Sequence, residues 1–291
     1  MTARRTPYVF LNGRVLPAPR ASINVFDRGW LYGDGLFETV RAYRGQPFGL
    51  REHLDRLRAS AAFLGFGLPR VAWRAQIAAL LRRNHLLSSD AAVRITVTRG
   101  TAVVPTLVPA ARTHPTVCMS ALPPAPILGR AQRRGVRATL LPFSRHGFLA
   151  EHKLLNYVPG VLGKAIAARH GAYEGLYVDA DGCITEGTTS NVFVWRRGHL
   201  LTPVPAGILP GLTRRFVINA ATAQGLAVRE QPLRLHDVFA AEEAFLTSSL
   251  AEVLPLTAID DRPIGTGKIG PCTRALQQAY RQIVDRDLAL R

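Results

Sequence analysis

A proline-rich segment near the middle of the chain constrains its fold more than any other feature. The segment reads ALPPAPILG and covers residues 121–129. Its three prolines cannot continue a helix or a central strand. We therefore expect an interdomain linker at residues 121–130. It would separate a small N-terminal domain at residues 1–120 from a larger C-terminal domain at residues 131–291.

Both predicted domains combine strands with helices, because the spacing of apolar residues changes along the chain. Residues 51–66 place apolar side chains at helical spacing, and residues 71–87 repeat this pattern. Further helices are expected near 160–170, 211–224 and 271–285. The expected strands cover residues 8–16, 36–43, 93–100, 116–122, 136–143, 173–187, 191–201, 226–232 and 242–249. This pattern predicts a mixed α/β (α+β) fold.

The composition favours a soluble protein of the cytoplasm. The chain has 291 residues, of which 47% are hydrophobic, and this is enough for a sizeable core. Cys118, Cys183 and Cys272 lie far apart, without the spacing of a zinc site, so we expect no metal and a reducing compartment. No apolar run approaches the length of a membrane span, and the N-terminus lacks the apolar core of a signal peptide.

The formal net charge of +17 raises the possibility of a basic, non-catalytic nucleic-acid-binding protein. Such proteins cluster their basic residues. Here the arginines are scattered singly or in pairs, with no basic run of five. We therefore expect no nucleic-acid partner, and we expect an attraction for small anionic molecules.

Lys153 is unusual because the chain holds only three lysines, the others being Lys164 and Lys268. It lies in the apolar stretch KLLNYV, on an extended segment just before a predicted helix. Such a lysine either extends its amine to water or forms a Schiff base. Arginine, which is always protonated, cannot form an imine.

Two further segments suit the chemistry of a Schiff base. Glu186 lies between a strand and the polar turn TTSN, where it could hold a pyridine nitrogen protonated. The stretch GILPGLTRR at 207–215 places Leu212 and Thr213 at the predicted start of a helix, which is a ready site for a phosphate. Further hydroxyl and guanidinium groups for that phosphate are expected from Thr247, Ser248, Ser249 and Arg56.

Seven segments together resemble, in order and separation, the fold-type IV pyridoxal-phosphate enzymes. This group contains branched-chain and D-amino acid aminotransferases and aminodeoxychorismate lyases. The segments are DRGWLYGDGLFETVRAY, HLDRLRASA, VTRG, KLLNYVPGVLGKA, YEGLYVDADGCITEGTTSNVFV, ILPGLTR and FLTSSLAEVLPL. The resemblance extends over nearly the whole chain.

The resemblance implies a role for each matching residue. Lys153 would form the Schiff base with pyridoxal 5'-phosphate, Glu186 would pair with its pyridine nitrogen, and Tyr157 would lie near its phenolic oxygen. The phosphate-binding set would be Arg56, Leu212, Thr213 and Ser249, with Ser248 beside it. The same resemblance implies two domains with the cofactor in the cleft between them, and a homodimer.

The substrate is less strongly indicated. Tyr32 and Phe37 follow the aromatic order of branched-chain enzymes, but Arg94 and Thr96 replace their Tyr-x-Arg pair. Candidates for binding the substrate carboxylate are Arg94, Arg145 and His146. The segment GTAVVPTLVP at 100–109 is apolar where D-specific enzymes carry Arg-x-His, and this favours apolar side chains.

The expected function is therefore an aminotransferase that acts on amino acids with apolar side chains and on 2-oxo acids by a ping-pong mechanism. The alternative on the same scaffold is an aminodeoxychorismate lyase, which releases pyruvate and 4-aminobenzoate.

Overall fold

The computed structural model describes residues 6–102, 106–110 and 113–289. The chain divides into two compact units. Unit 1 consists of Met1–Pro124 together with Lys153–Asn156, and unit 2 consists of Ala125–His152 and Tyr157–Arg291. The short segment that contains Lys153 therefore belongs with unit 1, although the sequence pattern assigned it to the C-terminal domain.

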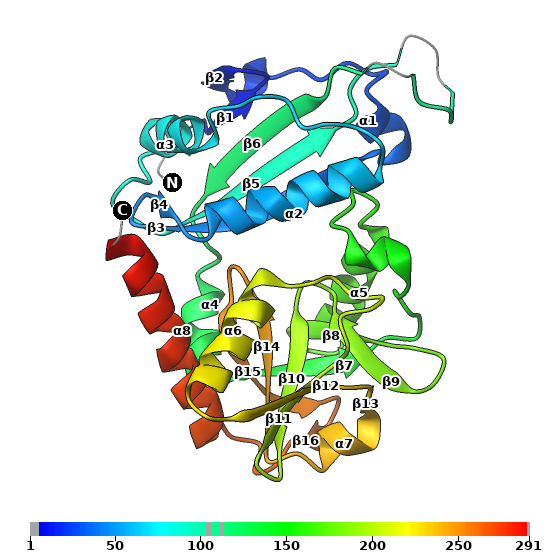
Figure 1. Cartoon of the computed structure of the whole chain (residues 1–291), viewed down its shortest axis with the longest axis vertical. Helices are drawn as coiled ribbons and strands as arrows, with labels where there is room; N and C mark the ends of the chain where they lie inside the picture. The colour runs from blue at the N-terminus through cyan, green and yellow to red at the C-terminus, as the bar shows by residue number, and fades with distance from the viewer. Residues whose placement is uncertain (1–5, 103–105, 111–112, 290–291) are drawn as a thin grey trace. The chain divides into compact units, whose positions relative to one another are not determined.

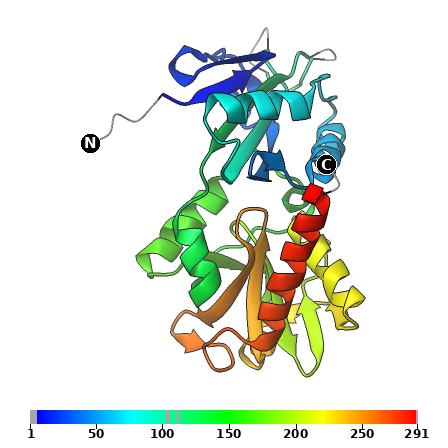
Figure 2. The same cartoon turned by 90° about the vertical axis from the view of Figure 1, so that its left-hand side faces the viewer.

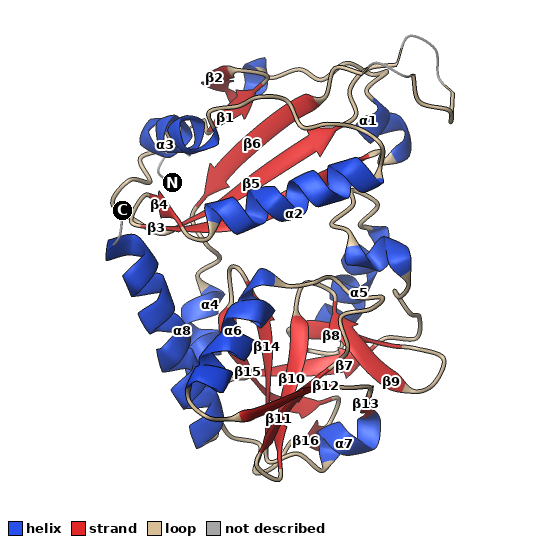
Figure 3. Cartoon of the chain, in the orientation of Figure 1, coloured by secondary structure: helices blue, strands red, loops and turns tan. Residues whose placement is uncertain are grey.

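Unit 1 is built on a sheet of six described strands (Figures 1 and 3). Their order is β2 (Arg14–Pro17), β1 (Tyr8–Leu11), β6 (Thr116–Leu122), β5 (Ala91–Thr98), β3 (Gly35–Tyr43) and β4 (Gln46–Pro47). All neighbours are antiparallel. The described helices of this unit are η1 (Ala18–Arg20), α1 (Arg28–Tyr32), α2 (Leu50–Phe63) and α3 (Trp73–Arg83).

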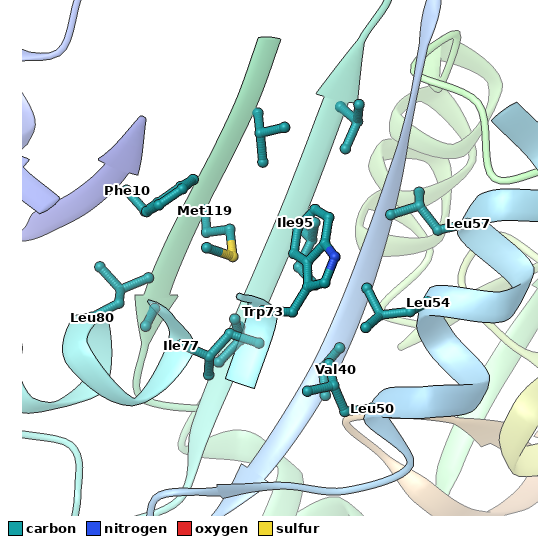
Figure 4. Packing of buried hydrophobic residues seen from close by; sticks show 14 of the residues in the cluster. Phe10, Val40, Leu50, Leu54, Leu57, Trp73, Ile77, Leu80, Ile95 and Met119 are labelled. Carbon is teal, nitrogen blue, oxygen red and sulfur yellow. The ribbon is translucent and has the colours of Figure 1, made fainter. Parts of the chain in front are cut away.

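The core of unit 1 lies between the sheet and the helices α2 and α3 (Figure 4). Leu54 and Leu57 of α2 and Ile77 of α3 contribute their apolar faces to it. Because side chains alternate across a strand, the other face of β3 and β5 carries a different set. That face holds Phe37 and Arg94, which become important for the site.

Unit 2 contains a mixed sheet of ten strands within the described residues. Nine of them follow one path: β12 (Ala227–Glu230), β11 (His199–Thr202), β10 (Asn191–Arg196), β14 (Glu243–Ser248), β15 (Glu252–Ile259), β7 (Val136–Leu140), β8 (Glu174–Val178), β9 (Cys183–Gly187) and β13 (Leu233–Arg234). The tenth, β16 (Arg262–Pro263), pairs with β15.

Helices connect and cover the strands of unit 2. They are α4 (Ile127–Arg134), η2 (Phe148–Glu151), α5 (Val158–Arg169), α6 (Leu212–Ala223), α7 (Leu235–Phe239) and α8 (Pro271–Ala289). The parallel pairs β7/β8 and β11/β12 are joined through α5 and α6, as parallel strands require a crossover. Figure 2 shows the C-terminal helix α8 running beside the orange strands β14 and β15.

The sequence pattern located most of these elements but missed some. It did not predict β15, whose Pro255 lacks the N–H group that a strand residue normally donates, yet Pro255 pairs with Phe245. The short helices α1 and α7 were also missed. Of residues 121–130, predicted as linker, residues 121–122 belong to β6 and residues 127–130 belong to α4. The helix can begin here because proline is tolerated immediately before a helix. Among the described residues, no helix is long and apolar enough to cross a membrane.

Candidate functional site

Lys153 is held against the beginning of β3 by backbone hydrogen bonds. The Phe37 N–H donates to the Lys153 carbonyl over 2.9 Å, and the Leu155 N–H donates to the Gly35 carbonyl over 3.0 Å. Leu154 forms an isolated antiparallel bridge with Leu36. A Cβ atom at Gly35 would lie 2.8 Å from the Leu155 side chain, so glycine permits this close approach. The extended conformation predicted before α5 is confirmed.

Two cationic side chains lie on the ring of Phe37. The Lys153 Nζ atom is 4.4 Å from the ring centre, and the Arg94 Cζ atom is 3.8 Å from it. Phe37 itself is buried, whereas Arg94 is exposed. Cation–π attraction favours both contacts. The structure thus brings together Lys153, Phe37 and Arg94, all three of which the sequence pattern proposed.

Tyr32 is hydrogen-bonded to the segment that contains Lys153. It ends α1, and its carbonyl accepts a hydrogen bond from Asn156 Nδ2 over 3.2 Å. Arg28 lies over the Tyr32 ring and donates to the carbonyls of Thr106 and Leu107. Arg28 therefore links α1 to the described part of the apolar segment 100–109. Residues 103–105 of that segment lie outside the described residues.

Arg56, predicted to bind phosphate, donates to a buried carboxylate of its own unit. Its Nε and Nη2 atoms bind the two oxygens of Glu38 at 2.7 and 2.8 Å. His53 Nδ1 lies 2.7 Å from Glu38 Oε2. Burial would raise the pKa of the Glu38 carboxyl. The Arg56 charge and the hydrogen bonds from His53 and Arg56 outweigh burial and lower that pKa well below its ordinary value. This cluster attaches α2 to β3.

Glu186, the predicted partner of a pyridine nitrogen, is buried on β9 and is only 3% exposed. Arg145 Nη1 donates to its Oε1 atom over 2.6 Å, and the Leu209 N–H donates to its Oε2 atom over 3.1 Å. Both interactions favour the ionised carboxylate. Arg145, which the sequence pattern offered as a binder of the substrate carboxylate, is instead paired with Glu186.

The beginning of α6 forms the second part of this region. Asn191 Nδ2 donates to the Leu209 carbonyl over 3.0 Å, so Asn191 and Glu186 bind opposite sides of the same residue. Gly211 follows at the N-cap, where no side chain caps the helix. A Cβ atom there would lie 1.9 Å from Asn191 Oδ1. The first N–H groups of α6, including those of Leu212 and Thr213, are therefore suited to an anion.

Hydroxyl groups at the end of β14 lie near that helix start. Thr247 pairs in register with Asn191, and cross-strand partners share one face of a sheet. Thr247 is 1% exposed, and its hydroxyl has no hydrogen-bond partner among the described residues. A buried hydroxyl without a partner is costly, and a phosphate would satisfy it. Ser248 and Ser249 follow, both half-buried. Ser248 Oγ accepts from the Ala251 N–H.

Tyr157 immediately precedes α5, and its hydroxyl donates to the Thr188 carbonyl over 2.5 Å. Its ring lies 5.8 Å from Arg145 Cζ. Tyr177, on β8, is a further buried residue that the sequence pattern did not select. Among the described residues its hydroxyl has no partner. Burial raises the pKa of Tyr177 well above its ordinary value.

The predicted residues therefore fall into two groups. Unit 1 brings together Lys153, Phe37, Arg94 and Tyr32, while Arg56 lies in the Glu38 cluster. Unit 2 contains Glu186, Tyr157, Leu212, Thr213, Ser248 and Ser249, of which Glu186 and Tyr157 both contact Arg145. Asn191 ends the polar turn TTSN, but its contact with Leu209 could not be predicted from the sequence. His146 is exposed, with its ring against Gly207.

Comparison with known proteins gives consistent similarities. The family described as Amino-transferase class IV matches residues 35–259. A putative branched-chain-amino-acid aminotransferase of Methanocaldococcus jannaschii is 38% identical over 94% of this chain and 96% of its own length. A D-alanine aminotransferase of Bacillus licheniformis is 34% identical over 95% of this chain and 96% of its own length.

The similarity extends to solved structures. A hypothetical aminotransferase from Mycobacterium tuberculosis, solved in its PLP-bound form, superimposes with a TM-score of 0.85 at 26% identity. The match covers 96% of this chain and 99% of that one.

Proposed function

The chain belongs to the class IV aminotransferase family, and from this premise we propose that it moves amino groups between α-amino acids with apolar side chains and 2-oxo acids. It is a pyridoxal-phosphate-dependent aminotransferase of fold type IV. The bound cofactor supplies an electron sink when the proton on the substrate Cα is removed. The choice of substrate is the part that requires support from individual residues.

The observation that carries the proposal is the pair of interactions at Leu209. Glu186 and Asn191 bind its N–H and its carbonyl, and α6 begins three residues later with no side-chain cap. The carboxylate of Glu186 and the anion site at the start of α6 are thus connected by the short segment 209–212. A pyridine ring that carries a phosphate requires both groups. The unpartnered hydroxyl of Thr247, judged within the described residues, also fits a phosphate.

Each proposed catalytic residue has a task that its surroundings support. Lys153 supplies the amine that binds the cofactor and moves the substrate proton. Glu186, which is paired with Arg145, holds the pyridine nitrogen in its protonated form. Tyr157 binds near the phenolic oxygen. Leu212, Thr213, Ser248 and Ser249 bind the phosphate.

The substrate proposal rests on the other face of the unit 1 sheet. Arg94 provides a cation for the substrate carboxylate, with Phe37 as its aromatic neighbour. Tyr32 is a further proposed contact of the substrate. Leu107 and Val108 are exposed apolar side chains on the segment that Arg28 holds. A segment that presents apolar side chains of this kind favours substrates whose own side chain carries no charge.

The test is a single half reaction with the yellow enzyme. Leucine, valine, alanine, phenylalanine and, for comparison, aspartate of each hand are added separately, and loss of the visible band is followed together with formation of the 2-oxo acid. We expect the apolar amino acids of one hand to react much faster than aspartate. If none of them reacts while aminodeoxychorismate yields pyruvate and 4-aminobenzoate catalytically, the enzyme is a lyase and the proposal is wrong.

We also propose a homodimer. Val158, Val161 and Leu162 form an exposed apolar stripe on α5, and Phe148 and Leu149 of η2 are exposed as well. Exposed apolar side chains that recur at helical spacing are typical of an interface. Light scattering after gel filtration should give twice the chain mass, and Val161→Asp with Leu162→Asp should give a folded monomer. A wild-type monomer at micromolar concentration would contradict this.

A cytoplasmic location is proposed from the three cysteines, which are all free thiols in the structure. Free thiols persist where the surroundings are reducing. Fractionation of cells that produce the protein, with the aminotransferase activity as the marker, tests this directly. Recovery of the activity outside the cytoplasm would contradict it.

A further inference from the structure

We propose that Glu174 is a positioning residue, whose buried carboxylate shapes the turn at residues 187–190 and thereby places the Tyr157 hydroxyl. The inference rests on the proposed function, because Tyr157 acts in the reaction only when the cofactor is bound. It assigns a task to Glu174 and to the hydroxyl groups of the turn.

The Glu174 carboxylate is the centre of a network within unit 2. Its side chain is fully buried at the beginning of β8. Oε2 accepts from Thr189 Oγ1 over 2.8 Å and from Ser190 Oγ over 3.0 Å. Oε1 accepts a short hydrogen bond from Thr188 Oγ1 and another from the Gly175 N–H over 3.1 Å. Three consecutive hydroxyl groups of one turn thus bind one carboxylate.

Lys164 supplies the matching positive charge. Its Nζ atom lies 2.9 Å from Glu174 Oε1 and donates to the Tyr173 carbonyl over 2.8 Å. A buried carboxylate is very costly unless a charge and several hydrogen bonds compensate it. The turn hydroxyls are therefore required donors, and the turn has little freedom to open while these hydrogen bonds are in place.

The turn connects directly to Tyr157. The Thr188 carbonyl accepts the Tyr157 hydroxyl over 2.5 Å, and the Thr188 N–H donates to the Gly175 carbonyl over 2.9 Å. A Cβ atom at Gly163 would lie 2.5 Å from Thr188 Cγ2, so α5 approaches the turn closely at a glycine. Thr188 is thus held through its hydroxyl, its N–H and its carbonyl.

A displaced Thr188 carbonyl would move the Tyr157 hydroxyl with it. Misplacement of a group near the reacting atoms by about 1 Å can cost a factor of up to ~100 in rate. Glu174 touches neither substrate nor cofactor in this scheme. Its effect on the reaction therefore has to pass through Tyr157, and this dependence can be measured.

The first experiment follows hydrogen exchange of the cofactor-free protein by mass spectrometry. In Glu174→Gln, the amides of Gly187 and Thr188 should exchange about tenfold faster, because the turn opens more readily. Glu243→Gln is the matched control. Glu243 is also buried, but it accepts from the N–H groups of Cys272 and Thr273 at the start of α8. Its loss should leave the exchange of the turn unchanged.

The second experiment is a double-mutant cycle in the cofactor-loaded enzyme. Glu174→Gln should lower kcat about tenfold, which corresponds to about 1.4 kcal/mol, with KM within about twofold. The absorption maximum of the bound cofactor should also shift. In a Tyr157→Phe background, Glu174→Gln should change kcat less than about twofold, because both changes act through one group. If Glu174→Gln does not fold, Thr189→Val is used in the same cycle.

The inference is overturned if the two substitutions multiply in kcat, or if exchange of the turn is the same in Glu174→Gln and wild type. Failure of the proposed function would be recognised by a different result. In that case the wild-type protein would neither take up the cofactor nor transfer amino groups, while hydrogen exchange would still report on the turn.

Discussion

At the scale of single residues, Lys153 and Arg94 lie on the same aromatic ring but can do different chemistry. Both are cations within cation–π distance of Phe37. A lysine amine loses its proton readily when it is desolvated or placed beside another positive charge, and it can then form an imine. A guanidinium stays protonated and is suited to a carboxylate. We therefore propose that Lys153 binds the cofactor covalently and that Arg94 binds the substrate carboxylate.

Lys153→Arg tests this division. The variant should fold, keep a positive charge above Phe37, and lose the visible band and all turnover, because arginine forms no imine. Absorption spectra and reduction with borohydride followed by mass spectrometry measure the covalent link. Lys268→Ala removes an exposed lysine and is the matched control, with unchanged colour and rate. A reducible link on another lysine of the Lys153→Arg protein would contradict the assignment.

At the scale of secondary-structure elements, α2 is attached to β3 through a buried charge cluster. Arg56 and His53 lie on α2, and Glu38 lies on β3 with 1% of its surface exposed. The pKa of Glu38 is lower in the folded protein than its ordinary value. Its contribution to stability is therefore complete above the ordinary pKa of a glutamate and is lost as the pH falls below it.

Glu38→Gln should lower the free energy of unfolding by about 3 kcal/mol at pH 7, because it leaves the buried His53 and the partly buried Arg56 without their carboxylate. The difference from wild type should shrink as the pH falls below about 4, where the unfolded wild-type chain takes up a proton that the folded chain does not. Urea titrations between pH 3 and pH 7 measure this. Asp55→Asn, an exposed change on α2, should cost less than about 0.5 kcal/mol. A pH-independent difference would show that the charge is not responsible.

The start of α6 gives a second prediction at this scale. Gly211→Ala would place a methyl group against Asn191 Oδ1, although the backbone angle of residue 211 is allowed for alanine. We expect a loss of about 1–3 kcal/mol in stability, together with weaker binding of pyridoxal phosphate. Unfolding curves and cofactor titrations measure the two effects. Gly67→Ala, where an added Cβ meets nothing within 4 Å, should change neither. Unaltered cofactor binding in Gly211→Ala would remove this helix start from the phosphate site.

At the scale of the whole molecule, binding of the cofactor should stabilise the folded chain. Free pyridoxal phosphate at about one hundred times its Kd should add about 2.7 kcal/mol to the free energy of unfolding, because the unfolded chain does not bind it. The thermal midpoint of the cofactor-free protein, measured with and without the cofactor, tests this. Pyridoxal, which lacks the phosphate, should raise the midpoint much less at equal concentration. Equal shifts would show that the phosphate contributes no binding energy.

The sequence by itself determined the fold class, the family and the chemically distinctive residues. Apolar spacing reports the local preference of the backbone, so most strands and the longer helices could be predicted from it. Lys153 and Glu186 could be proposed because few side chains suit their chemistry and because seven segments occurred in a recognisable order. The strand β15 was not predicted, because it contains Pro255 and the local preference of proline is against a strand.

Only the tertiary structure decided which distant groups share a partner. Asn191 meets Thr247 through strand register, and Glu174 meets the turn hydroxyls because β8 and β9 are adjacent. The sequence suggested that Arg145 binds the substrate carboxylate and that Arg56 binds the phosphate, but in the structure each pairs with a buried glutamate. These choices follow from burial. A carboxylate that the fold removes from water must find a cation or hydrogen-bond donors, and which donors are within reach depends on packing between segments far apart in the chain.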